Sequence, residues 1–207
     1  PDGVDVALEG VGGLDARALY VFLRRLRPQR MIDVGCGWST RLTADVNTRY
    51  LDGRMDLTCI DPYAAALEGC PGVTRVIRRR VQDVAVETFD ELGPGDILFI
   101  DSSHVAKTGS DVCHLYFEVV PRLRRGVWIH IHDIFLPEDY PETWVREGRS
   151  WNEQYLVRAL LWRAPFCASG SDLRTPGSTC ARILPRRWAG GRCTAAASGW
   201  SACDLSS

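Results

Sequence analysis

Four short apolar runs in this chain each end on an aspartate, and these acids are the first residues whose chemistry needs an explanation. They are Asp33, Asp61, Asp101 and Asp133. Runs of this length that are rich in Ile, Val and aromatic residues, without polar alternation, indicate strands buried on both faces, as in a parallel sheet. Because ligands of open α/β sheets bind where such strands end, we expect one site lined with carboxylates.

Three of the four histidines in the chain lie beside the last two of these acids. His104 follows Asp101 in a loop, whereas His130 and His132 lie two residues apart on one strand and therefore share a face. An imidazole beside a reacting group can act as a general base near neutral pH. The candidate catalytic residues are therefore His104 and Asp101. A hydrogen-bonded structural role is the alternative for each histidine, and we favour it for His130.

A glycine-containing turn follows the first acid, in the sequence Asp33-Val34-Gly35-Cys36-Gly37-Trp38-Ser39-Thr40. Its two glycines let the backbone approach a ligand closely, and the helix that follows presents free N–H groups. The dinucleotide fingerprint has a third glycine where Thr40 stands, which disfavours a hydride-transfer cofactor. The turn alone is also compatible with a tight turn that binds nothing.

Two later positions support a nucleotide-like cofactor. Asp61 ends the next strand, where a carboxylate can accept hydrogen bonds from both hydroxyls of a ribose. Gln82 and Asp83 follow a weaker strand and are placed to contact an adenine edge.

The elements that must position these residues alternate between strand and helix. Ser150-Trp151-Asn152-Glu153 has the form of a capping box, with Ser at the cap and Glu three residues later, and predicts a helix start. This alternation predicts an α/β fold, a doubly wound, mostly parallel Rossmann-like sheet with helices on both faces. The expected strands are 30–34, 57–60, 74–77, 97–100 and 127–131, and the expected helices include 39–50, 112–119 and a helix after residue 150.

The last 41 residues, 167–207, break this pattern. They contain no Val, Phe, Tyr, Glu or Lys but half of the eight cysteines. A segment of this composition cannot bury enough apolar surface to form its own core. We therefore expect a folded domain over residues 1–166, closing strands of the sheet that are missing, and a tail that is disordered or frame-shifted. A genuine surface extension is the alternative.

Composition narrows the function classes. The chain has 207 residues, a net charge of -1 and 45% hydrophobic residues, and it lacks the sustained basic face that nucleic-acid binding needs. It has neither a long apolar stretch nor the layout of a signal peptide at its start. We therefore expect a cytoplasmic protein with no nucleic-acid or membrane partner. Because the chain begins with Pro1, we expect its native start to be missing or processed.

At these positions the sequence resembles the class I S-adenosylmethionine-dependent methyltransferases, over roughly residues 14–161. The turn at Asp33 resembles their first motif, Asp61 their ribose-binding acid and Asp83 their adenine-contacting position. The segments 98–104 and 130–135 resemble the methyltransferase domain 24 family. The resemblance implies S-adenosylmethionine as cofactor. The implied cofactor-binding residues are Asp33, Gly35, Gly37, Ser39, Asp61, Gln82, Asp83 and Asp101.

A more distant similarity is to the catechol O-methyltransferase type, in which acids ending strands four and five hold a magnesium ion. Asp101 and Asp133 match those acids, and His104 falls where that type has its basic lysine. The Asn that completes that metal site is Ile134 here, so His132, His104 or the substrate must supply a ligand. The predicted metal set is Asp101, His132 and Asp133. Oxygen ligands favour Mg²⁺, and imidazoles favour Mn²⁺, Fe²⁺ or Zn²⁺.

Taken together, these features predict a methyltransferase that acts on a hydroxyl of a small molecule, with His104 as base. A divalent metal (Mg²⁺, Mn²⁺ or Fe²⁺) is a further candidate cofactor, and a homo-oligomer is a candidate assembly. One alternative is a metal-dependent hydrolase or oxygenase that uses the His and Asp cluster. Another is a non-catalytic remnant of the same fold that lacks its closing strands.

Overall fold

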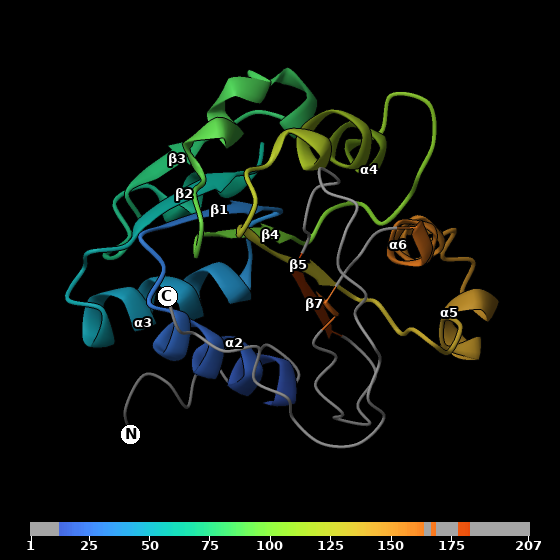
Figure 1. Ribbon diagram of the computed structural model, residues 1–207, viewed down its shortest axis with the longest axis horizontal. Helices are drawn as coiled ribbons and strands as arrows, with labels where there is room; N and C mark the ends of the chain where they lie inside the picture. The colour runs from blue at the N-terminus through green and yellow to red at the C-terminus, as the bar shows by residue number, and fades with distance from the viewer. Residues whose placement is uncertain (1–12, 164–166, 169–177, 183–207) are drawn as a thin grey trace, which may run out of the picture.

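A computed structural model of the protein describes residues 13–163, 167–168 and 178–182. Within these residues the chain forms one seven-stranded sheet with helices on both faces (Figure 1). The strands are β1 (Arg30–Val34), β2 (Asp56–Ile60), β3 (Arg75–Ile77), β4 (Ile97–Ile100), β5 (Trp128–His132), β6 (Cys167–Ala168) and β7 (Ser178–Arg182). The α-helices are α2 (Gly13–Leu26), α3 (Trp38–Tyr50), α4 (Asp111–His114), α5 (Glu142–Arg146) and α6 (Glu153–Arg163).

The strand order is β3-β2-β1-β4-β5-β7-β6, and β1 to β5 are parallel. This confirms the doubly wound parallel sheet that the sequence predicts. β1 lies between β2 and β4, and Asp33 is paired in register with Cys59 of β2 and Phe99 of β4. Because the five parallel strands run in one direction, the four aspartates that end or follow β1, β2, β4 and β5 share one edge of the sheet.

Alternate residues of each central strand pack on opposite faces of the sheet. On one face Met31, Leu57 and Phe99 contact the buried side of α2 and α3, and on the other Ile32, Leu98 and Ile129 contact α4 and the turns that follow it. Figure 1 shows α2 and α3 together on one face and α4 on the other. This two-residue alternation explains why the strands read as continuous apolar runs.

The helix predicted over residues 112–119 is three short pieces. α4 continues into a π-helical turn, Leu115–Val119, and a 3-10 turn, Val120–Arg122, where Pro121 ends regular helix. Three further 3-10 segments lie between β2 and β4, namely Ala64–Leu67, Val81–Asp83 and Val86–Glu91, and the loop at residues 93–96 leads into β4. Among the described residues, no helix has the length and apolar character that crossing a membrane requires.

The prediction that the closing strands are missing is corrected by β7 and β6. β7 lies antiparallel along β5, from the pair Trp128 and Arg182 to the pair His132 and Ser178, and β6 pairs with β7. The outer edge of β5 offers unpaired backbone groups, and an antiparallel strand can satisfy them by backbone pairing, without an apolar composition. The rest of the predicted tail, residues 169–177 and 183–207, lies outside the described residues, so the division after residue 166 stays a prediction.

Candidate active site

The glycine turn after β1 lies directly against the end of β4. Gly35 has φ +88°, and a Cβ added to it would lie 1.6 Å from the backbone oxygen of Asp101. The amide of Gly35 donates to the Ile60 carbonyl at 3.2 Å, and the amide of Asp101 donates to the Val34 carbonyl at 2.9 Å. Only glycine tolerates both this φ and this contact. The turn and the end of β4 therefore form one continuous backbone surface.

Asp33 is a fully buried carboxyl group at the base of this surface. Its Oδ2 accepts a hydrogen bond from the Thr40 hydroxyl at 2.7 Å, whereas its Oδ1 is buried without a hydrogen-bond partner. Burial raises the pKa of Asp33 from 3.8 to about 7, although the Thr40 hydrogen bond lowers it. Asp33 can therefore hold a proton near neutral pH.

Asp61 and Ser39 flank the same turn. Asp61 accepts a hydrogen bond from the backbone N–H of Cys36 at 3.3 Å through Oδ2 and one from Tyr63 at 2.5 Å through Oδ1. Ser39 is buried in the first turn of α3, one residue before Thr40. The structure thus brings Asp33, Asp61 and Ser39 together around the turn, as the sequence predicts.

Gln82 and Asp83 already have protein partners. The Gln82 amide donates to the Gly109 carbonyl at 3.0 Å. Both carboxylate oxygens of Asp83 accept from the guanidinium of Arg80, at 2.8 and 3.0 Å, and this pairing lowers the pKa of Asp83. Their predicted contact with an adenine stays a prediction.

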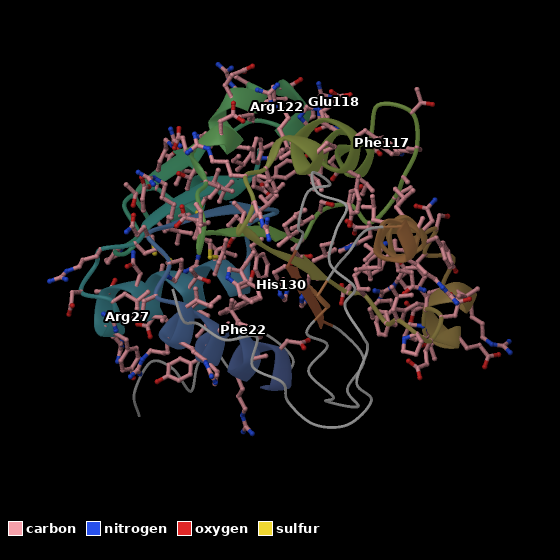
Figure 2. The ribbon with its side chains drawn as sticks, viewed as in Figure 1. Phe22, Arg27, Phe117, Glu118, Arg122 and His130 are labelled. Carbon is pink, nitrogen blue, oxygen red and sulfur yellow. The ribbon has the colours of Figure 1, made fainter. Side chains whose placement is uncertain are left out.

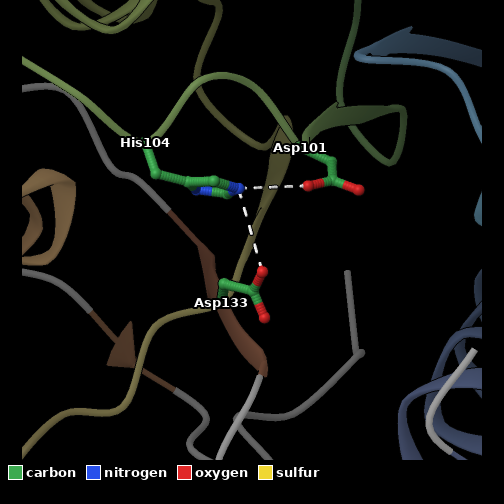
Figure 3. Close-up of side chains that lie close together, drawn as sticks. All are labelled: Asp101, His104 and Asp133. Carbon is green, nitrogen blue, oxygen red and sulfur yellow. Dashed lines mark ion pairs between the residues drawn. The ribbon is translucent and has the colours of Figure 1, made fainter. Parts of the chain in front are cut away.

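The described residues contain one group of acids and histidines close enough to share a ligand, and it consists of Asp101, His104 and Asp133 (Figure 3). His104 Nε2 lies 3.3 Å from Asp101 Oδ1 and 3.8 Å from Asp133 Oδ2. The candidate ligand atoms of the three residues all lie within 4.8 Å of one another. We call these three residues the acid–histidine cluster.

Glu153 is the functional residue that the sequence analysis missed. It is fully buried, its Oε2 lies 2.8 Å from His104 Nδ1, and its Oε1 accepts from the Tyr116 hydroxyl at 2.9 Å. The predicted capping box is therefore wrong, because the Glu153 carboxylate turns inward to His104 instead of back to Ser150. The sequence signal that could have found it is a glutamate beside apolar residues that pack inward, such as Val157.

His104 is held as a cation by this arrangement. Burial lowers its pKa, but the hydrogen bonds to Asp101 and Glu153 outweigh that effect and raise the pKa to about 9. Both ring nitrogens face carboxylate oxygens, which can only accept, so each nitrogen carries a proton near neutral pH. Burial also raises the pKa of Asp133.

His130 and His132 project from β5 on the face of the sheet opposite to His104. Their rings are stacked on the same face of β5 as Phe99, which confirms the predicted shared face. That face is covered by α2 and α3, whereas His104 faces Glu153 of α6 on the opposite side. His132 Nε2 is 3.7 Å from Asp133 Oδ1, but His132 is not in the group that could hold a metal. His130 is buried against the Phe99 ring, and burial lowers its pKa to about 3, so its structural role stays a prediction.

Aromatic side chains from the segment after β5 cover His104. The Trp151 ring lies over the His104 ring with centroids 4.2 Å apart, and Trp144 meets Trp151 edge-on at 4.9 Å. The guanidinium of Arg149 lies 4.3 Å from the centre of the Trp144 ring. This aromatic segment forms one wall beside the acid–histidine cluster.

Comparison with known proteins decides the family. Residues 32–134, which contain the glycine turn, Asp61 and the acid–histidine cluster, match the model of a methyltransferase domain, Methyltransf_24. The chain belongs to this methyltransferase family. The class I S-adenosylmethionine-dependent type that the sequence resembles is thereby confirmed.

Two solved structures have the same fold as the methyltransferase, and one curated protein matches part of its sequence. The structure of the O-methyltransferase TomG from Streptomyces achromogenes, in complex with SAM, has a TM-score of 0.56 and 17% identity over 89% of this chain and 90% of that one. An O-methyltransferase from Bacillus cereus, in complex with SAH, has a TM-score of 0.52 and 16% identity over 88% and 91%. An uncharacterized protein of Archaeoglobus fulgidus is 34% identical over 84 residues, and the match spans 38% of each chain.

Proposed function

We propose that the methyltransferase transfers the methyl group of S-adenosylmethionine to a hydroxyl oxygen of a small molecule. The observation that carries this proposal is the contact between Gly35 and the backbone of Asp101. It supports the proposal because the glycine turn lies beside the acid–histidine cluster, so a cofactor on the turn and an acceptor at the cluster would be neighbours. The alignment of the two reactants is the main contribution that the protein makes to methyl transfer. The O-methyltransferases with the same fold support an oxygen acceptor.

The cofactor half of the proposed site consists of the glycine turn with Asp33, Ser39 and Asp61. Asp61 would accept the ribose hydroxyls, since its carboxylate stands at the end of β2 beside the turn. The backbone of Gly35 and Gly37 would contact the cofactor, because a Cβ at Gly37 would meet nothing within 4 Å and the space beside it is open. Gln82, Asp83 and Asp101 complete the proposed cofactor contacts.

The acceptor half consists of the acid–histidine cluster. An attacking hydroxyl must lose its proton, and His104 with Asp101 is the proposed acid–base pair. His104 can accept that proton only in its neutral form, which its pKa of about 9 makes scarce at neutral pH. Turnover through this base should therefore increase with pH. The Trp151 ring packs on the buried His104 imidazole and would shield it from water.

The cluster also fits a divalent metal ion. Two carboxylates and one imidazole nitrogen lie within 4.8 Å of one another, and this mixed donor set suits Mn²⁺ or Fe²⁺ better than Mg²⁺. We propose Asp101, His104 and Asp133 as the ligands, with His104 in place of the His132 of the sequence prediction, because His132 is close to Asp133 but is not in this group. A bound ion would orient the acceptor oxygen and lower its pKa. It would act in place of the His104 base, because a ring nitrogen that ligates the ion cannot also accept the proton of the acceptor hydroxyl.

Thermal unfolding tests this function directly. After chelation, the protein is heated alone, with S-adenosylhomocysteine, with Mn²⁺ and with Mg²⁺, because a ligand that binds only the folded state raises the unfolding temperature. Stabilisation by S-adenosylhomocysteine supports the methyltransferase. Stabilisation by metal alone favours a metal-dependent hydrolase or oxygenase, and stabilisation by neither favours a non-catalytic remnant.

Two variants sharpen this test. Asp61→Ala should weaken the binding of S-adenosylhomocysteine in calorimetry, whereas Asp56→Ala, at the opposite end of β2, should not. Equal affinity in the two variants would contradict the ribose role of Asp61. His104→Ala should abolish methyl transfer and leave cofactor binding intact.

A further inference from the structure

Glu153 has the contacts of a group that acts through His104. Its carboxylate is 0% exposed, and its two oxygens are each used once, by His104 Nδ1 at 2.8 Å and by the Tyr116 hydroxyl at 2.9 Å. A buried carboxylate is costly unless its oxygens are paired. The two partners of this buried carboxyl group are the ring of His104, which belongs to the acid–histidine cluster, and the buried Tyr116.

The backbone of His104 is held by the same short segment. The His104 carbonyl accepts from the N–H groups of Asn152 and Glu153 at 3.0 and 3.2 Å. The side chain of Asn152 in turn accepts from the amide of Ala106 at 2.6 Å. With the Trp151 ring over the imidazole, three consecutive residues at the start of α6 contact the backbone, the ring face and the ring edge of His104.

These contacts hold the His104 backbone in an unfavourable conformation. Its φ is +58°, in the left-handed region that non-glycine residues seldom occupy. An imidazole with one nitrogen bonded to a buried carboxylate has a fixed ring orientation, and its other nitrogen is then presented in one direction. Here that direction is toward Asp101 and Asp133 (Figure 3).

Resting on the proposed function, we propose that Glu153 is a positioning residue, whose carboxylate, held by Tyr116, fixes the His104 ring so that Nε2 faces Asp101 and Asp133. In this proposal the Glu153 carboxylate keeps a proton on His104 Nδ1 in every state of the site, whether Nε2 is protonated, binds a metal ion or accepts a hydrogen bond from an acceptor hydroxyl. It also joins the acceptor-side aromatic segment to the acid–histidine cluster, because α6 begins where that segment ends.

Proton NMR of the S-adenosylhomocysteine-bound protein tests this role. The chain has four histidines, so the ring N–H signals are few, and the signal missing from His104→Asn identifies His104. We expect a low-field, slowly exchanging Nδ1 proton in the wild type. In Glu153→Gln it should move upfield and exchange with water about tenfold faster or more, since hydrogen bonds to charged acceptors are roughly twice as strong as neutral ones.

Tyr116→Phe should shift the same signal in the same direction but less, because the Glu153 carboxylate keeps its charge and loses one donor. Glu118→Gln is the matched control, since Glu118 is exposed on the outer side of the Leu115–Val119 turn (Figure 2) and its loss should leave the signal unchanged. Cofactor affinity should stay the same in all three variants. If Glu153→Gln does not fold, Tyr116→Phe decides the question.

An unmoved His104 signal in a folded Glu153→Gln or Tyr116→Phe protein would overturn the positioning role and leave Glu153 with a purely structural one. Failure of the wild type to bind S-adenosylhomocysteine would instead contradict the proposed function. The ring proton can still be measured in that case, so the two failures are distinguishable.

Discussion

Asp33 should make the stability of the methyltransferase fall as pH rises, and Asp33→Asn should remove that dependence. The folded protein keeps the Asp33 proton up to about pH 7, whereas the unfolded chain loses it near 3.8. Between these values the folded state binds a proton that the unfolded state has lost, so the unfolding free energy falls with pH. The shift of roughly 3 pKa units corresponds to a loss of about 4 kcal/mol in unfolding free energy, with a maximum slope of about 1.4 kcal/mol per pH unit.

The measurement is equilibrium unfolding in urea, between about pH 4 and pH 8, for the ligand-free wild type and Asp33→Asn. The difference in unfolding free energy should increase in favour of the variant by about 4 kcal/mol across this range and become constant above about pH 7. Thr40→Val removes the hydrogen bond that lowers the pKa of Asp33, so it should move the plateau to higher pH. Parallel curves for wild type and Asp33→Asn would refute the assignment of a buried, proton-holding carboxyl.

Three further changes test other parts of the site. Gly35→Ala should prevent folding or lower the unfolding free energy by at least ~3 kcal/mol, since its Cβ would overlap the Asp101 carbonyl at a positive φ. The control Gly37→Ala has open space around its Cβ and should unfold at nearly the wild-type temperature. Turnover should increase about tenfold per pH unit up to about pH 9, where His104 becomes neutral, and a flat profile above pH 7 would exclude His104 as the base. Asn152→Ala should cost about 1 kcal/mol in urea unfolding, because it removes the hydrogen-bond acceptor of the partly buried Ala106 amide, whereas Asn152→Asp keeps that acceptor.

The sheet and the position of the site follow from the sequence because both depend on local patterns. Each of the five predicted strands is present within one residue of its expected bounds, since a run of apolar residues buried on both faces fits only a central strand. The glycine turn could also be predicted from the sequence. The structure explains the glycine at position 35, because its close approach to Asp101 leaves no room for a side chain. The aspartates then share an edge because parallel strands all end on the same side.

Contacts between residues far apart in the sequence could not be predicted from local patterns. The sequence Ser150-Trp151-Asn152-Glu153 satisfies a local capping rule, but in the folded protein the Glu153 carboxylate has a better partner 49 residues earlier, in His104. His132 was a candidate for the ligand that Ile134 does not supply, and the sequence could not show that His104, 29 residues before Asp133, lies close to both Asp101 and Asp133. β7, which lies between β5 and β6, was missed because an antiparallel strand can form by backbone pairing, with little sign in its composition.

The backbone of the acid–histidine cluster indicates that its geometry is imposed by the surrounding fold. Among the described residues, four non-glycine residues have a positive φ, and His104 and Asp133 are two of them. Such conformations cost about 1–3 kcal/mol each and persist only where neighbouring contacts outweigh that cost. For His104 those contacts come from Asn152 and Glu153, which lie at the start of α6. A change at α6 should therefore alter the direction in which His104 Nε2 points before it alters the sheet, so the reactive geometry depends on a helix that the strand-end acids alone do not reveal.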